Sequence, residues 1–226
     1  MRAPKHSFFL LMLLAYGTLS AQIPGYQGKR WPISIDVNLS PALADWVFQP
    51  EGQLELNWRA GIEADHVISR RLSAGANVGL FSTRQNFLRG SQTGFLDLDG
   101  QYYGLQLKHY RFLRRGNIAP LGPYQRWEVQ YLRYRLSDPR NEFPNPLDED
   151  RITQDLAVSF TLGTQRMLGE HFTYHIGIQT AFVLNLTGEF ARRNGPQQAY
   201  LNQIAIRRLR GMYALNLNAG IGVLLF

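Results

Sequence analysis

The residues of this sequence that could carry chemistry are charged side chains at every second position of otherwise apolar segments. Alternate side chains of a β-strand point to the same face, so Arg59 and Glu63 share one face while Ile62 lies on the other. Carboxylates and cations gathered on one face can form ion pairs or guide a charged solute. The positions that share this polar face are Asp36, Glu55, Arg59, Glu63, Lys108, Arg126, Glu128 and Asp155.

Acyl-transfer chemistry would need a histidine beside a nucleophile. His175 points to the polar face of a regular strand, and the preceding strand carries Ser159. A turn at 166–171 would put residue 163 opposite His175 and leave Ser159 four residues, or about 13 Å, away, which is beyond hydrogen-bond reach. The sequence also has no HExxH, P-loop or GxSxG motif and no cysteine. We therefore expect no catalytic, cofactor or metal site.

The elements that must position these residues are eight segments in which apolar and polar residues alternate with a period of two, as in strands of transmembrane barrels. After residue 21 no run of about 18 apolar residues could form a transmembrane helix, which leaves a closed barrel as the other way to span a membrane. We predict an all-β, eight-stranded, antiparallel up-and-down transmembrane β-barrel. Its segments are Ile33–Ser40, Leu54–Glu63, Leu72–Ser82, Tyr103–Lys108, Arg126–Tyr131, Asp155–Leu162, Phe172–Leu184 and Tyr213–Leu225.

The first residues have the layout of a secretory signal peptide. Arg2 and Lys5 precede the apolar run Phe8–Tyr16, and small residues follow it. We predict cleavage after Ala21, which leaves one barrel domain of residues 22–226. Removing residues 1–21 takes away Arg2 and Lys5 and no acid, so the formal net charge falls from +7 to +5. An exported barrel has no cytoplasmic domain, so nucleic acid is not an expected partner despite the positive charge.

The connections between the segments fall into two classes of length. The first, third, fifth and seventh are long, and the others are short. Outer-membrane barrels have long extracellular loops and short periplasmic turns, so this order predicts that both termini are periplasmic. The long links are 41–53, 83–101, 137–151 and 187–212, and the short links are 65–71, 113–123 and 166–171.

Eight strands leave an interior just wide enough for side chains. Charges in so narrow a space must pair, because an unpaired buried ion costs several kcal/mol. We predict that the charged positions form a salt-bridged network that closes the lumen. A charged pathway for a small solute would have the same composition and stays an alternative.

Arginines gather where the extracellular side is expected. Two follow the fifth segment on its outward face, and the rest lie in the last link. A guanidinium grips a phosphate bidentately, which suggests contact with the lipid A of lipopolysaccharide. Residues 199–212 mix helical and strand spacing, so a cap over the lumen and extended strand ends both stay open. The arginines are Arg133, Arg135, Arg192, Arg193, Arg207, Arg208 and Arg210.

Three stretches, Ala21–Trp31, Ile68–Phe81 and Gly116–Tyr124, resemble segments of small outer-membrane β-barrels of the Bacteroidota, of the OmpA/OmpX-like single-barrel type. The resemblance implies an outer-membrane protein that meets the barrel-assembly machinery, membrane lipid and lipopolysaccharide, and in some cases another envelope protein. We expect a non-enzymatic structural or accessory role. A narrow pore or a transport- or secretion-associated barrel is the first alternative, and a lipid A-modifying enzyme is the second.

Overall fold

The structure is a computed structural model that describes residues 28–41, 56–89, 92–111, 119–137, 152–185 and 196–225. The predicted signal peptide, residues 1–21, lies outside these ranges. So do three of the predicted site residues, Glu55, Arg192 and Arg193.

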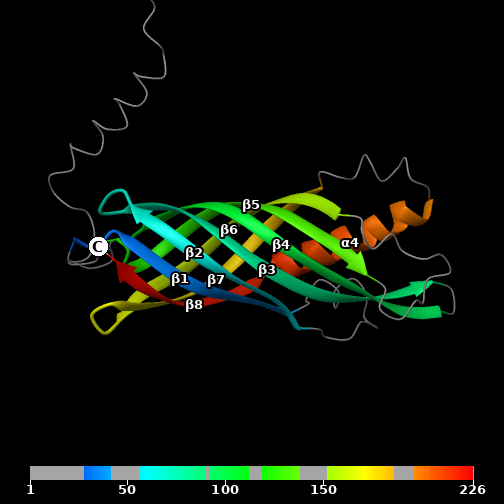
Figure 1. The fold of residues 1–226 in the computed structure, drawn as a ribbon, viewed down its shortest axis with the longest axis horizontal. Helices are drawn as coiled ribbons and strands as arrows, with labels where there is room; N and C mark the ends of the chain where they lie inside the picture. Colours follow the sequence, from blue (N-terminus) through cyan, green and yellow to red (C-terminus); the bar gives the residue numbers. More distant parts are fainter. Residues whose placement is uncertain are drawn as a thin grey trace, which may run out of the picture.

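Eight antiparallel strands form one closed barrel in which each strand pairs with its neighbours in the sequence and the last pairs with the first (Figure 1). This confirms the predicted eight-stranded, antiparallel up-and-down barrel. Strand closure pairs the backbone groups that an open sheet edge would leave exposed. The strands are β1 (Trp31–Pro41), β2 (Leu56–Val67), β3 (Leu72–Arg89), β4 (Gln92–Tyr110), β5 (Gly122–Ser137), β6 (Ile152–Leu168), β7 (Phe172–Asn185) and β8 (Asn216–Leu225).

The two ends of the barrel differ, and we name them by their connections. The turn end holds the start of β1, the end of β8 and the tight turns at 68–71 and 169–171. Gly169 has a φ of 84°, a left-handed conformation that glycine adopts without a steric cost. The loop end is the opposite one, where β3 meets β4 and the helix α4 (Pro196–Ala214) begins. In Figure 1 the turn end is on the left and α4 is on the right.

Burial alternates along most of each strand, and over the middle of the barrel it places polar side chains inside and apolar ones outside. In β5, the inward Arg126, Glu128 and Gln130 are buried, whereas the outward Trp127 and Val129 are exposed. An apolar exterior around a polar interior is typical of a barrel surrounded by lipid. The outward apolar set includes Ile35, Val37, Ile62, Leu80, Leu105, Leu162, Ile176, Phe182, Leu217 and Ile221.

No helix in the described part of the chain is both long enough and apolar enough to cross a membrane.

The link predicted at 83–101 is instead a continuation of two strands. β3 runs to Arg89, β4 begins at Gln92, and the two stay paired from Leu72↔His109 up to Arg89↔Gln92. Once two antiparallel strands are in register, each added pair extends the same hydrogen-bonded ladder. The predicted strands end where apolar alternation weakens, but backbone pairing does not require that alternation.

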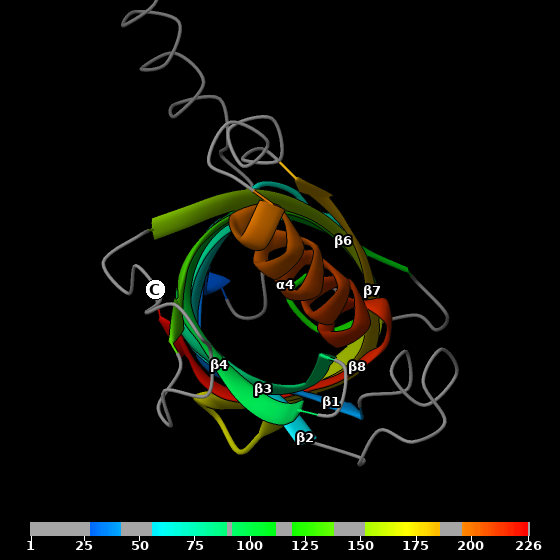
Figure 2. The same ribbon diagram turned by 90° about the vertical axis from the view of Figure 1, so that its right-hand side faces the viewer.

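The last predicted strand also differs, because it begins at Asn216 and not at Tyr213. The chain before it forms α4, which lies within the ring of strands near the loop end (Figure 2). Tyr213 was predicted to face outward, but it belongs to the helix and is fully buried. The period of two that assigned it a direction does not apply in a helix.

Candidate functional site

The interior of the barrel is filled from the turn end to the loop end by three groups of side chains. We call the middle one the charged layer and the one around α4 the helix layer. The turn end is closed by an aromatic plug of Val67, Tyr110, Ala119 and Tyr124. The charged layer consists of Asp36, Glu63, Asp65, Lys108, Arg126, Glu128 and His175. The helix layer consists of Ala205, Leu209, Met212 and Tyr213 of α4 with Phe81, Leu98, Tyr102, Leu132, Tyr134, Leu136, Ala157 and Val183 of the barrel wall.

Glu63 is the centre of the charged layer. One of its carboxylate oxygens accepts a hydrogen bond from the Lys108 ammonium, and the other accepts one from Arg126 Nη1 at 2.8 Å. The Lys108 ammonium also donates to Asp65 Oδ2 at 2.7 Å. The Arg126 guanidinium lies 3.5 Å from Asp36 Oδ2. Because all five side chains are buried, each charged group is stabilised by an oppositely charged neighbour and not by water.

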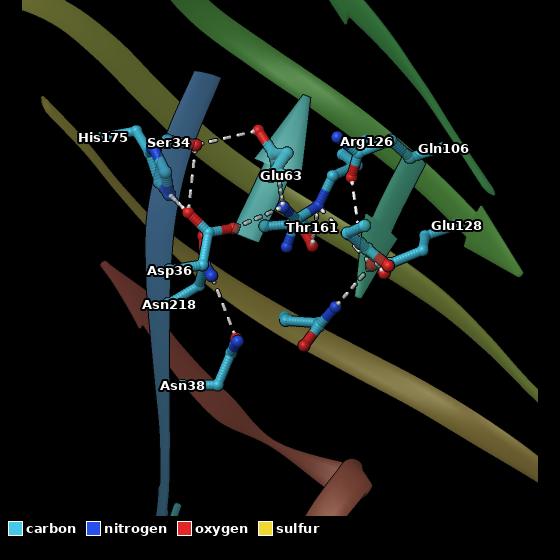
Figure 3. A network of polar contacts seen from close by, with 12 residues as sticks. Ser34, Asp36, Asn38, Glu63, Gln106, Arg126, Glu128, Thr161, His175 and Asn218 are labelled. Atoms are coloured by element: carbon cyan, nitrogen blue, oxygen red, sulfur yellow. Dashed lines mark hydrogen bonds and ion pairs between the residues drawn. The ribbon is translucent and has the colours of Figure 1, made fainter. Parts of the chain in front are cut away.

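His175 is the member of the charged layer that lies on β7. Its Nε2 lies 2.9 Å from Asp36 Oδ1, and Figure 3 shows the two side chains pointing toward each other beside Ser34. The Ser34 hydroxyl donates to the same Asp36 oxygen at 3.3 Å. Gly220 lies opposite His175 on β8, where a methyl group would overlap both Asp36 and the imidazole. A glycine on an inward position therefore marks where a large side chain from another strand crosses the lumen.

Ser159 is far from His175. His175 pairs with Gln165, not with residue 163 as predicted, because the turn between β6 and β7 is tighter than expected. Ser159 is then six residues farther along β6, or about 20 Å. Its hydroxyl donates to Glu128 Oε2 at 3.0 Å. The histidine and the serine are thus built into different parts of the network.

Glu128 accepts hydrogen bonds mainly from neutral side chains. Gln179 donates to Oε2 at 3.1 Å, and Asn77 and Gln130 both donate to Oε1. The Arg126 Nε lies 3.7 Å away. Several donors around one carboxylate offset the cost of removing its charge from water.

Arg59 connects the charged layer to the helix layer. Its guanidinium donates to Gln130 Oε1 at 3.2 Å and also to Gln179. Its carbon Cζ lies 4.1 Å from the centroid of the Tyr213 ring and 5.9 Å from that of Tyr102. A cation over an aromatic face is an attractive contact, so α4 rests on the strand network through this arginine.

The aromatic plug is made of two tilted tyrosine rings, with the centroids of Tyr110 and Tyr124 5.9 Å apart. The Tyr110 hydroxyl donates to Gln165 Oε1 at 3.1 Å. Val67 and Ala119 fill the remaining space and are almost completely buried. The turn end is therefore closed by packing below the charged layer.

The helix layer is held by one apolar stripe of α4. Ala205, Leu209 and Met212 recur at a helical spacing on the face that packs against the barrel wall, and all three are buried. Arg208 extends from the same side, where its Nε donates to Thr83 Oγ1 at 2.8 Å and its Nη2 to Asn57 Oδ1 at 2.9 Å. The prediction that Arg208 contacts lipopolysaccharide is therefore wrong, because its guanidinium lies inside the lumen.

The structure places the described members of the two predicted sets as follows. Asp36, Arg59, Glu63, Lys108, Arg126, Glu128 and Asp155 are all buried in the lumen. Asp155 lies apart from the charged layer and accepts a hydrogen bond from the Tyr134 hydroxyl at 2.7 Å. Arg133, Arg135, Arg207 and Arg210 are exposed.

Two parts of the lumen were missed in the sequence. Asp65 falls in a predicted link, 65–71, although it continues the alternation of Arg59 and Glu63. The helix layer had a signal of its own, because apolar residues such as Phe81 and Leu132 occupy inward positions of the wall. Inward apolar residues in a polar lumen indicate that something apolar must cover them.

Among the residues that the structure describes, no group of three His, Asp or Glu side chains is arranged to hold a metal ion.

No protein-family model matches the chain, and no curated protein sequence matches it. Among solved structures, the chain is similar to the N-terminal β-barrel domain of OprF from Pseudomonas aeruginosa. The TM-score is 0.43 and the sequence identity is 8%. The similarity covers 85% of this chain and 96% of that chain.

Proposed function

We propose that this protein is an integral outer-membrane β-barrel with a closed lumen and a non-enzymatic, structural or accessory role. The observation that carries the proposal is the filled lumen. From the turn end to the loop end it is occupied by the aromatic plug, the charged layer and the helix layer. A barrel that conducts needs a continuous aqueous path, and buried ion pairs across the middle of the lumen leave no room for one.

The outer membrane is favoured by the exterior of the barrel. Large aliphatic side chains such as Ile35, Leu105, Ile176 and Leu217 are exposed all around the wall. Leaving this surface in water would be costly, and a closed antiparallel barrel is the β-structure that membranes accept. A protein of this kind would meet the barrel-assembly machinery during insertion and lipid afterwards.

The difference between the two ends supports an orientation. Tight turns at 68–71 and 169–171 lie at the turn end, and the long β3–β4 hairpin and α4 lie at the loop end. Periplasmic turns are short in barrels of the outer membrane. On this basis the turn end, with both ends of the barrel domain, faces the periplasm, and the loop end contacts lipopolysaccharide or another envelope protein.

A narrow pore or a transport-associated barrel is the second candidate, and α4 is the observation that favours it. A helix inside a barrel closes the lumen by side-chain packing and not by the hydrogen-bonded wall. It could leave without breaking a strand pair. A pore formed in this way would still be blocked by the charged layer, which belongs to the wall itself.

The test combines three measurements on the full chain. Cell fractionation should recover the protein in the outer membrane. The purified protein in a planar lipid bilayer should show no stepwise conductance, and deleting the gene should leave the mass spectrum of lipid A unchanged. Discrete conductance steps would support the pore, and a shifted lipid A mass would support a lipid-modifying enzyme. Either result would contradict the proposed role.

A further inference from the structure

The outward face of β5 changes from apolar to charged over a few residues. Val129 is followed on this face by Tyr131 and then by Arg133 and Arg135, all of them exposed. Tyr131 pairs with Tyr103 of β4, so two aromatic rings mark one level of the wall. Tyrosines with an apolar body and a polar tip collect where hydrocarbon meets headgroups. Arg133 lies two residues, or about 7 Å, beyond that level, where lipid phosphates are found.

A shallow hollow of about 470 Å³ surrounds these two arginines on the outside of the barrel. Gln101 pairs with Arg133, and Asp99 pairs with Arg135, so both belong to the adjacent strand β4. Leu80 of β3 and Ile152 of β6 form its apolar sides. The hollow therefore has a polar centre, which would face lipid headgroups, and apolar sides, which would face lipid acyl chains.

The two arginines differ from a third arginine of the same wall. The guanidinium of Arg84 holds Asp97 with two hydrogen bonds, from Nε to Oδ1 at 2.6 Å and from Nη2 to Oδ2 at 3.0 Å. Within the described ranges, neither Arg133 nor Arg135 forms an ion pair, although Asp99 lies opposite Arg135. Their donor groups are thus available to an anion from outside the chain.

We propose that this hollow binds the phosphate of a lipid headgroup, with Arg133 and Arg135 as the binding residues. The inference rests on the proposed function, since the loop end must face the outer leaflet for the arginines to meet its phosphates. The backbone positions of Arg133 and Arg135 lie on one face of the strand about 7 Å apart, and each guanidinium can direct paired N–H donors at one phosphate between them. The acyl chains of the same lipid would lie along Leu80 and the apolar wall below it.

Asp99 sharpens the proposal, because it lines the hollow and a carboxylate there would repel an anion. Arg133 is flanked by the neutral Gln101 and is the stronger contact, and Arg135 is weakened by Asp99. Replacing Asp99 by Asn should therefore tighten the binding of a phosphate. If the hollow binds no phosphate, Asp99→Asn should leave the affinity for the lipid unchanged.

The test measures the binding of defined lipids to the full-length barrel in detergent micelles by native mass spectrometry. The probes are bisphosphorylated lipid A, monophosphorylated lipid A and phosphatidylglycerol. The double variant Arg133→Gln/Arg135→Gln should lose affinity by more than about tenfold, the usual size for one charge-assisted hydrogen bond, and Arg133→Gln alone should account for most of the loss. The variant Arg133→Lys/Arg135→Lys keeps the charge but not the forked donors. Its affinity should lie between that of the wild type and that of the Gln double variant.

The matched control is Arg70→Gln/Arg84→Gln, which removes the same net charge from a turn and from an arginine that is already paired. This control should bind the lipids as the wild type does. A preference of the wild type for bisphosphorylated lipid A identifies lipid A as the source of the phosphate, and equal binding of phosphatidylglycerol identifies any anionic phospholipid. Equal binding by the wild type and the Arg133/Arg135 double variant, or equal losses in the control, would overturn the proposal.

Fractionation separates this result from the proposed function. If the wild type and the double variant are both found in the outer membrane and bind lipids equally, the phosphate site is wrong and the function stands. If the wild type itself is not in the outer membrane, the proposed function fails. Comparing boiled and unboiled samples by gel electrophoresis verifies that each variant is folded.

Discussion

The charged layer and the helix layer close the same lumen by opposite physical means. In the charged layer, side chains of five strands meet as ion pairs, and Glu63 pairs with both Lys108 and Arg126. In the helix layer, one inserted helix covers an apolar wall with residues such as Leu209. Ion pairs in a buried space need every partner, whereas apolar packing weakens in proportion to the surface lost. The loss of one partner should therefore destabilise the charged layer strongly, whereas the loss of one apolar group should weaken the helix layer only in part.

The two layers also differ in how they are attached to the barrel. Every member of the charged layer belongs to a strand of the wall. α4 replaces the strand that would continue β8: pairing between β7 and β8 ends at Gln179↔Asn216. At this point the Thr180 hydroxyl donates to the carbonyl oxygen of Ala214 at 2.8 Å. The helix can therefore be removed as an element without breaking a strand pair, whereas the charged layer stands on the strands and can be changed only one side chain at a time.

The largest effect is expected in the charged layer. Glu63→Gln removes the carboxylate that two buried cations share, and we expect the free energy of unfolding to fall by about 3–5 kcal/mol. Urea unfolding of the barrel in lipid vesicles measures this loss. Asp97→Asn, which breaks the exposed pair with Arg84, is the control and should cost about 1 kcal/mol or less. Similar losses in the two variants would mean that the ion pairs of the lumen are hydrated.

A smaller and more local effect is expected in the helix layer. Leu209→Ala removes a fully buried side chain of α4, and we expect a loss of about 2–3 kcal/mol, because the helix can settle into part of the space. Hydrogen exchange should rise along α4 and remain low in the strands. Faster exchange throughout the barrel would show that the helix layer and the wall unfold as one unit.

The contact between the two layers can be measured separately. Tyr213→Leu keeps an apolar residue beside Arg59 but removes the aromatic face, which should cost about 1–2 kcal/mol in a desolvated site. A double-mutant cycle with Arg59→Met isolates the coupling between the two side chains. A coupling near zero would mean that α4 is held by its apolar stripe alone.

The smallest effect is expected on conductance. Replacing residues 197–212 with a flexible linker of Gly and Ser removes the α4 residues Ala205, Leu209 and Met212 from the helix layer but leaves the charged layer in place. We therefore expect no stepwise conductance in a planar bilayer, as for the wild type. Conductance steps in this variant alone would identify α4 as the only barrier and would contradict the proposal that the charged layer closes the lumen.

Much of the wall was predictable, and the reason is geometric. Side chains of a strand alternate between two faces, so the inward direction of Asp36, Lys108 and Glu128 follows once the apolar face is known. Asp65 was missed because the end of its strand was placed too early. Strand ends were the weakest part of the prediction, since backbone pairing continues where the side-chain pattern fades.

The contacts within the lumen were not predictable from the alternation of inward and outward positions. His175 and Asp36 meet because β7, β8 and β1 are neighbours and Gly220 leaves a gap between them. Gln165 and not residue 163 lies opposite His175, a shift that depends on the length of one turn. A shift of two residues keeps every side chain on its face, so the alternating pattern is the same for both registers and cannot distinguish them.

The sequence by itself determined the number of strands, their order and which residues face inward, because these depend on local alternation and on short connections. The tertiary structure decided the conformation of residues 199–212. Their apolar residues fit neither period clearly, and a single stripe becomes buried as a helix because the wall offers inward residues such as Phe81, Leu132 and Val183. Local preference could not specify this helix, since the surface that stabilises it comes from strands far away in the sequence.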